Sequence, residues 1–244
     1  MTDPIGLITC ARYALPPNHL QYCGPPKSEE IGAYLQESAS DEKLSEMLSQ
    51  FETLYPYLTY IARGNGITDP YDPRVVEAYW IGNSLLKKLS QKSLYTHFSE
   101  SLSLKKRLTN KELEWLIGKI PKGALAHHTF HVLNVITRTG HHSIQHTIET
   151  MDSCRIGWGA LQKIAMGKVQ LLTSELIYSN GKLILSKPIL KQFDISHGMV
   201  IKSDDIGSTY TYHWGTLCAQ ITSSQLDNLT KVTNSAIRLA NLTI

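Results

Sequence analysis

Apolar residues in the first 120 positions recur at intervals of three and four, the spacing of one face of a helix. The clearest run consists of Leu44, Met47, Leu48, Phe51 and Leu54. Asp41 is placed to cap this helix at its N-terminus, and Pro56 is expected to end or kink it.

Three more helix starts carry capping residues. Asp72 precedes Pro73, a pair that suits the N-cap and the first helical position. Asn83 can cap the next helix, and Thr109 and Glu112 have the spacing of a capping box. We therefore predict that the N-terminal part is mostly helical.

The pattern changes after Gly123 to short runs rich in β-branched and apolar residues. We predict strands over residues 131–139, 161–164, 169–173, 175–178, 183–186, 199–202 and 209–214. Asn180-Gly181 is a hairpin turn sequence, because both residues accept a positive φ. Helical spacing returns after Ser223, which can cap a C-terminal helix, as can Ser224.

These elements predict an α+β protein with two domains. Residues 1–150 form a mostly helical domain with a histidine-rich end. Residues 151–244 form a small OB-like β-barrel followed by a C-terminal helix, since several short strands separated by turns favour a barrel.

Composition narrows the choice of partners and compartment. The 244 residues include 24 basic and 21 acidic side chains, a net charge of +3, so nucleic acid is not an expected partner. No apolar run approaches the length of a membrane span, and the N-terminus lacks the pattern of a signal peptide. We expect a cytoplasmic protein whose four cysteines are thiols.

Six of the ten histidines fall within twenty residues: His127, His128, His131, His141, His142 and His146. His127 and His131 are four apart, as are His142 and His146, and either spacing lets two imidazoles share one metal ion. Imidazole suits several transition metals, and Glu149 or Asp152 can complete such a site. The alternative is a run of histidines that hydrogen-bond to backbone and water.

The N-terminal segment 10–26 mixes four chemically active residues with four prolines. The active residues are Cys10, Arg12, His19 and Cys23. Prolines fix the backbone, so the segment is interpreted either as the wall of a site or as an arm wrapped on the helical domain. It also resembles the opening of an uncharacterised bacterial protein family.

The predicted barrel carries a second set of residues at its two ends. It opens with Cys154, followed five residues later by Gly159, and its last predicted strand ends in His213-Trp214-Gly215. In this order and spacing, residues 154–241 resemble the HypC-type assembly chaperones of [NiFe]-hydrogenases. Those chaperones begin with a cysteine, a short apolar stretch, a proline and a glycine, and their last strand carries a histidine before a terminal helix.

The resemblance implies that the protein carries iron. The family's cysteine ligates an iron atom that bears carbon monoxide and cyanide. The family works with a scaffold protein, HypD, and delivers the iron to the hydrogenase large subunit. Cys154 and His213 would then be the working residues, because a thiolate binds such iron and can be exchanged for another thiolate.

The chain departs from the family at three points. Cys154 is internal, whereas the family's cysteine follows the initiator methionine. Trp158 replaces the family's proline, and Arg155 stands where an apolar residue is usual.

Three hypotheses follow. The first is a hydrogenase-maturation chaperone acting through Cys154 and His213. The second is a metal-dependent enzyme or metal-binding protein that uses the cluster between His127 and His146. The third is an oligonucleotide-binding barrel, which the small basic excess disfavours. The chain has no nucleophile triad, phosphate loop or dinucleotide fingerprint, which favours a binding role over catalysis.

Overall fold

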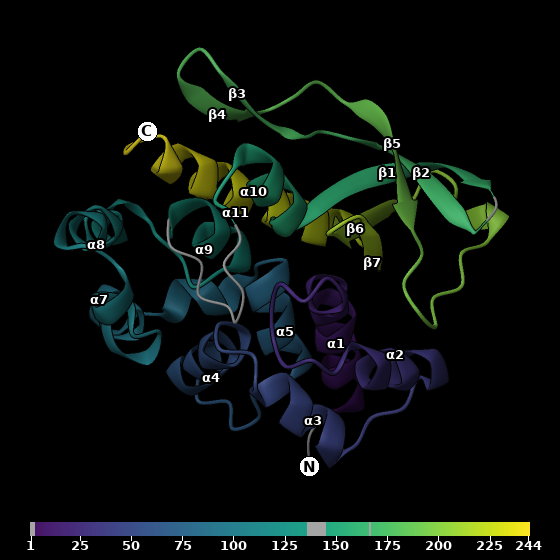
Figure 1. The fold of residues 1–244 in the computed structure, drawn as a ribbon, viewed down its shortest axis with the longest axis horizontal. Coiled ribbons are helices and arrows are strands. Elements are labelled where there is room, and N and C mark those ends of the chain that lie inside the picture. The colour runs from purple at the N-terminus through teal and green to yellow at the C-terminus, as the bar shows by residue number, and fades with distance from the viewer. Residues whose placement is uncertain (1–2, 136–144, 166) are drawn as a thin grey trace.

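The computed structural model describes residues 3–135, 145–165 and 167–244. It confirms the α+β class: helices fill the N-terminal part, and a closed five-stranded barrel, a two-stranded hairpin and a C-terminal helix follow (Figure 1). The helices of the N-terminal part are α1 (Pro4–His19), α2 (Ser28–Glu37), α3 (Glu42–Ser49), α4 (Leu54–Gly64), α5 (Pro73–Trp80), α6 (Gln91–Thr96), α7 (Leu104–Arg107), α8 (Asn110–Ile117), α9 (His128–Asn134) and α10 (Ile148–Cys154).

The predicted caps of the N-terminal helices are in place, but the C-terminal helix (Ser223–Ala240) is capped by Thr222 and not by Ser223 or Ser224. The Asp41 carboxylate accepts a hydrogen bond from Leu44 N at 3.0 Å, and Asp72 caps α5 in the same way. Thr109 and Glu112 form the capping box of α8. The predicted helix through Leu54 is wrong, however, because α3 ends at Ser49. Pro56 lies in the first turn of α4, where its missing N–H removes no helical hydrogen bond.

The proline-rich N-terminal segment is not an irregular arm. Most of it belongs to α1, which begins at the cap Asp3 and keeps Pro16 and Pro17 within its last turn. A proline there has no N–H for the carbonyl one turn earlier. This local defect in α1 becomes important for the candidate site.

The predicted strand over 131–139 is also wrong where the structure describes it. Residues 128–134 form α9, and residues 136–139 lie outside the described residues. The Asn134 side chain donates to Ala236 O at 3.1 Å, which ties α9 to the C-terminal helix α11 (Ser223–Ala240). Tertiary packing therefore overrides the β-branched composition of this stretch.

The barrel has the strand order β1-β2-β5-β7-β6, and the hairpin β3–β4 stands apart from it. The strands are β1 (Gly157–Ala165), β2 (Lys168–Thr173), β3 (Leu176–Ser179), β4 (Lys182–Leu185), β5 (Ile189–Asp194), β6 (Thr209–His213) and β7 (Thr216–Ile221). The barrel closes by one parallel pair between β5 and β7, Asp194 opposite Thr216.

The predicted hairpin turn is confirmed, because Asn180 and Gly181 both have positive φ, 50° and 77°. The predicted strand over 199–202 is wrong, since those residues form irregular chain. Strands β5 and β7 were not predicted. Consequently His213 lies at the end of the penultimate strand, and β7 rather than β6 is the last one.

Close backbone packing explains the glycine near the start of the barrel. A Cβ on Gly159 would lie 2.7 Å from Leu172 O on the neighbouring strand. Larger residues are therefore excluded from this position of β1. A register shift between Thr211 and Tyr212 lies just before His213 and re-aims the end of β6.

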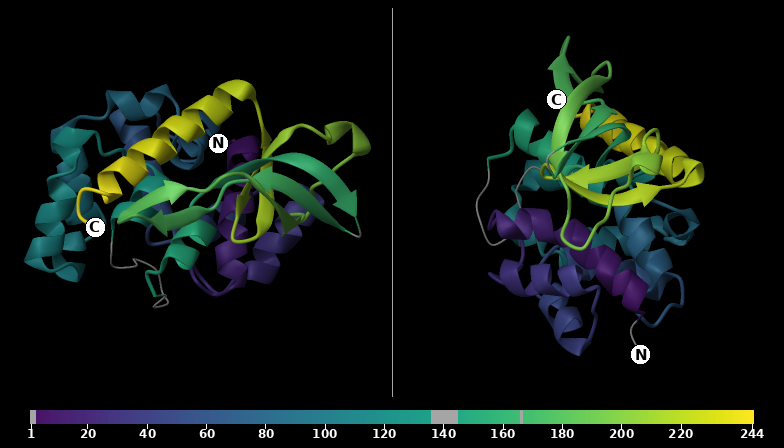
Figure 2. Two further views of the ribbon diagram at one scale, coloured as in Figure 1. Left: turned by 90° about the horizontal axis from the view of Figure 1, so that it is seen from above. Right: turned by 90° about the vertical axis from the view of Figure 1, so that its right-hand side faces the viewer.

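The main hydrophobic core crosses the boundary between the two parts. It includes helical residues such as Tyr13 and Tyr79 together with Cys218 of β7 and Leu229 of α11. A second, smaller core fills the barrel itself. Figure 2 shows α11 running from the barrel across to the N-terminal helices. Among the described residues, no helix is both long and apolar enough to cross a membrane.

His97 is a buried histidine away from the barrel. It begins a short π-helical turn, His97–Ser101, and its ring stacks on Tyr60 at a centroid distance of 4.4 Å. The side chain is 1% exposed, and neither ring nitrogen has a hydrogen-bond partner among the described residues. Burial lowers the pKa of His97 from 6.5 to about 3.

We expect His97 to make the fold acid-sensitive. The unfolded chain takes up the proton near pH 6.5 and the folded chain only near pH 3, so stability is complete above pH 6.5 and falls as the pH drops below it. Between pH 7 and pH 5 this one group removes about 2 kcal/mol from the free energy of unfolding. In urea titrations, H97F should lose about 2 kcal/mol less than the wild type over this range. An equal loss in both proteins would contradict the assignment.

Candidate metal centre

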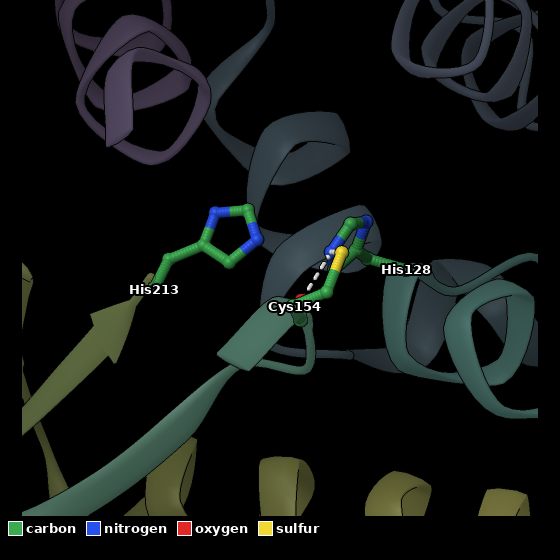
Figure 3. Close-up of side chains that lie close together, drawn as sticks. All are labelled: His128, Cys154 and His213. Atoms are coloured by element: carbon green, nitrogen blue, oxygen red, sulfur yellow. Dashed lines mark hydrogen bonds between the residues drawn. The ribbon is translucent and has the colours of Figure 1, made fainter. Parts of the chain in front are cut away.

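Three potential ligands meet where the helical part touches the barrel. One ligand atom from each of His128, Cys154 and His213 can be chosen so that all lie within 4.8 Å of one another. Figure 3 shows the three side chains approaching one another from α9, from the junction of α10 and β1, and from the end of β6. The His128 and His213 rings are 5.1 Å apart in an edge-on arrangement.

Backbone contacts bring Cys154 and His213 together. Cys154 is the last residue of α10, and His213 is the last residue of β6. The N–H of Trp214 donates to Ser153 O at 2.8 Å, so the residue after the histidine is bonded to the residue before the cysteine. Because these backbone groups are bonded to each other, closure of the barrel sets how far Cys154 lies from His213.

The orientation of His213 is set by a carbonyl of α1. Its Nδ1 lies 2.7 Å from Tyr13 O, and a carbonyl can only accept, so Nδ1 carries the proton. The helical donors to that carbonyl would be the residues three and four positions on, which are Pro16 and Pro17 and have no N–H. Tyr13 O is thus left by its own helix for His213, and Nε2 keeps the lone pair that binds a metal.

His128 has the opposite tautomer. Its Nε2 lies 2.8 Å from Cys154 O and therefore donates to it, while Nδ1 lies 3.1 Å from the Tyr79 hydroxyl and accepts from it. Burial lowers the pKa of His128 well below 6.5, and neighbouring His213 lowers it further. The same Nε2 is 3.9 Å from Cys154 Sγ, so His128 presents an N–H donor beside the sulfur.

An ion pair between Asp152 and Arg155, which precede and follow Cys154 in the chain, holds the segment that carries the thiol. Arg155 is 1% exposed, and its Nη2 lies 2.8 Å from Asp152 Oδ1. The same Nη2 donates to Ser174 O, and Asp152 also accepts from Leu176 N at 2.7 Å. These bonds join the last turn of α10 to the chain around β3, so the thiol stands on a rigid support.

The three ligands open into a small apolar cavity. Its volume is about 70 Å³, room for about five water-sized groups. Aromatic rings form much of its wall: Tyr22, Phe51, Tyr79, Trp80 and Trp214. Tyr22 and Trp214 are partly exposed, and their ring centroids lie 4.8 Å apart. Among its described lining residues, none is an aspartate, glutamate, lysine or arginine.

One sulfur and two imidazoles in an uncharged pocket define the metals that the site suits. Thiolate and imidazole favour zinc, iron, nickel and copper over magnesium and calcium, which prefer oxygen. Cys154 is half-buried and His128 and His213 are buried. A metal here would be held by protein atoms in surroundings of low polarity.

The other predicted site residues take different positions. His127 is the N-cap of α9, where Nδ1 accepts from Thr129 N, so it does not share a helix face with His131. His131 lines the cavity and contacts the Tyr57 hydroxyl through Nδ1 at 3.1 Å. His146 lies in irregular chain before α10. His141 and His142 lie outside the described residues.

The four candidate residues of the N-terminal segment also take different positions, and one of them lines the cavity. Cys23 lines the cavity, whereas Cys10 is fully buried, and burial raises the pKa of Cys10 to about 12. Arg12 is half-buried on α1, and His19 is exposed at its end. Sequence reasoning missed Tyr13 O and Tyr79, which orient the two histidines, because neither contact is local.

The chain was compared with family models, curated proteins and solved structures. The model of a family of unknown function, DUF6390, matches residues 2–244. No curated protein and no solved structure matches the chain.

The ligand set predicts which histidine a metal needs. His213→Gln should weaken cobalt(II) binding by about 100-fold or more, because losing a ligand costs more than losing a group that orients one, which costs about 10–100-fold. Equilibrium dialysis under anaerobic conditions measures the affinity. His146→Gln is the matched control and should bind like the wild type. Weak binding by the control and normal binding by His213→Gln would instead favour the cluster around His146.

The role of the α1 carbonyl predicts an unusual variant. In Pro17→Ala the new N–H competes with His213 for Tyr13 O, so the His213 tautomer is no longer fixed. Thermal stability should hold or rise, since alanine suits a helix, while cobalt(II) affinity should fall about tenfold or more. Ring-nitrogen NMR shifts of His213 report the tautomer. Unchanged shifts together with unchanged affinity would show that the prolines do not set this ring.

Proposed function

The chain belongs to the DUF6390 family, whose function is unknown, and we propose that this protein is an accessory chaperone of [NiFe]-hydrogenase maturation. Its cargo would be the iron atom carrying cyanide and carbon monoxide, bound by Cys154 Sγ and His213 Nε2. The observation that carries the proposal is the meeting of these two residues within one ligand group. In the sequence they correspond to the cysteine and histidine of the HypC-type chaperones, which the barrel resembles, although His213 ends the penultimate strand rather than the last.

The hydrogen bonds of His213 and His128 support different roles for the two histidines. His213 keeps its Nε2 lone pair because Nδ1 donates to Tyr13 O, so it can ligate iron. His128 has its proton on Nε2, close to both Cys154 O and Cys154 Sγ. It would therefore donate a hydrogen bond to the iron-bound thiolate or to a cyanide nitrogen rather than bind iron.

The cavity supports this class of cargo by its size and polarity. Carbon monoxide makes little demand for hydrogen bonds, and cyanide needs a donor at its nitrogen only. A volume of about 70 Å³ lined by aromatic rings accommodates a few diatomic ligands and keeps bulk water away from the metal. A fully hydrated cation would have to lose its water molecules to enter a cavity with an apolar wall, and this desolvation is unfavourable.

Transfer would proceed by exchange of thiolates. The bonds from iron to Cys154 Sγ and His213 Nε2 would break as ligands of the acceptor, a thiolate among them, form their own bonds to the same iron. The proton released by the acceptor's thiol passes to the Cys154 sulfur, so no oxidant or reductant is needed. The resemblance suggests a HypD-like scaffold as donor and the hydrogenase large subunit as acceptor.

We further propose a cytoplasmic location. A carrier thiolate must stay reduced to bind iron, and the cytoplasm maintains thiols in that state. The four cysteines form no disulfide in the structure, which agrees with such a compartment.

A second candidate function is binding of another transition metal at the same three residues. The donor set itself favours it, because one thiolate and two imidazoles also suit zinc, nickel and copper. The predicted enzyme centred on His127 and the later histidines would have to be rebuilt around His128, which is the member of that cluster found in this ligand group.

The iron proposal is tested by infrared spectroscopy. The protein is incubated anaerobically with a HypC–HypD complex loaded with the iron unit, and is then separated from it. The wild type should acquire carbonyl and cyanide stretching bands, and Cys154→Ala should lose at least about nine-tenths of their intensity because the sulfur ligand is gone. Cys218→Ala, whose thiol is buried outside the cavity, is the matched control and should behave like the wild type. Absence of the bands from the wild type, or their retention in Cys154→Ala, would refute the proposal.

A further inference from the structure

Cys23 is a second thiol on the wall of the same cavity. It lies in the loop between α1 and α2, is half-buried, and lines the cavity together with Cys154, His128 and His213. We propose that Cys23 provides a second thiolate ligand to a metal centre bound at Cys154 and His213. The inference rests on the proposed metal-binding function and adds a ligand that the HypC resemblance does not supply.

The loop that carries Cys23 is built to hold its position. The Asn18 side chain donates to Cys23 O at 2.8 Å and to Pro25 O at 2.6 Å, which holds the chain from Cys23 to Pro25 against the end of α1. Gly24 has a φ of +81°, and a Cβ there would lie 2.3 Å from the Phe51 ring. Glycine is therefore required beside Cys23, because only glycine combines this backbone with so close an approach.

Tyr79 lies on the wall of the same cavity as Cys23, Cys154 and His128. Burial keeps the pKa of Tyr79 well above 10, so its hydroxyl stays protonated and donates to His128 Nδ1.

The chemistry of the added bond is simple. Cys23 is not part of the group whose ligand atoms lie within 4.8 Å, so it joins as a further ligand once a metal centre occupies the cavity. The Cys23 S–H bond breaks, its proton goes to solvent, and a sulfur–metal bond forms without any change of oxidation state. A second thiolate would keep the cargo attached while the bond to Cys154 is exchanged for one to the acceptor.

Cobalt(II) is the probe that counts thiolate ligands. Each cobalt–thiolate bond contributes to a charge-transfer absorption in the near ultraviolet, so two thiolates give about twice the intensity of one. Anaerobic titration of the wild type should therefore give about twice the saturating absorbance of Cys23→Ser, with cobalt still bound in the variant. Cys218→Ala should match the wild type, because its thiol does not line the cavity.

The outcomes separate this inference from the proposed function. Full wild-type absorbance in Cys23→Ser would overturn the second ligand and leave the Cys154–His213 site intact. Wild-type absorbance in Cys154→Ser would instead refute the site on which both proposals rest. Half intensity in each single variant supports the two-thiolate centre.

Alkylation of the unaltered protein gives a test that needs no variant. Trypsin cuts after Arg12, Lys27, Arg155 and Lys202, which places the four cysteines on four separate peptides. Cobalt(II) should slow the reaction of both Cys23 and Cys154 with iodoacetamide by about tenfold or more, as read by mass spectrometry. Cys10 and Cys218 are fully buried and report any unfolding. A Cys23 rate that is unchanged by cobalt, with Cys154 protected, would rule out the second ligand.

Discussion

The hydrogen bond from His213 Nδ1 to Tyr13 O, at 2.7 Å, is the contact on which the arrangement of the candidate site depends. It joins the first helix to the sixth strand, two elements nearly 200 residues apart in the chain. It also decides the chemistry of His213, since a proton fixed on Nδ1 leaves the lone pair on Nε2. The contact is possible because Pro16 and Pro17 cannot donate to that carbonyl. A carbonyl that has no donor within its own helix thus orients the His213 ring.

Burial makes the two histidines complementary rather than equivalent. His213 carries a proton on Nδ1, whereas His128 carries its proton on Nε2. His128 can therefore donate to sulfur or to a ligand, whereas His213 can present Nε2 to a metal. Aromatic rings form much of the wall around both. The carbonyl that each ring contacts sets its tautomer. The two tautomers are therefore a consequence of the fold and cannot be inferred from either histidine alone.

The local signals in the sequence predicted the helix caps and the hairpin turn, because those structures depend on residues within four positions of one another. The resemblance of the barrel singled out Cys154 and His213, and the structure brings them together. The sequence could not single out His128 among the six histidines, because the four-residue spacing assumed one helix face. His127 is instead a cap, and among the described histidines of the cluster His128 is the one that contacts Cys154. Similarly, α9 looked like a strand because its packing on α11 cannot be read locally.

For the carrier role proposed above, the internal position of Cys154 would set how iron is bound and released. A cysteine at a chain terminus is mobile and loses conformational freedom when it binds, whereas Cys154 is already held by α10 and by the Arg155–Asp152 pair. Such preorganisation favours tight binding and slow release. Release of the proposed cargo would then require movement of the surrounding wall rather than of the cysteine. Tyr22 and Trp214 are partly exposed members of that wall and lie in two surface turns. A partner that displaced these rings would widen the cavity without disturbing the bonds that orient the candidate ligands.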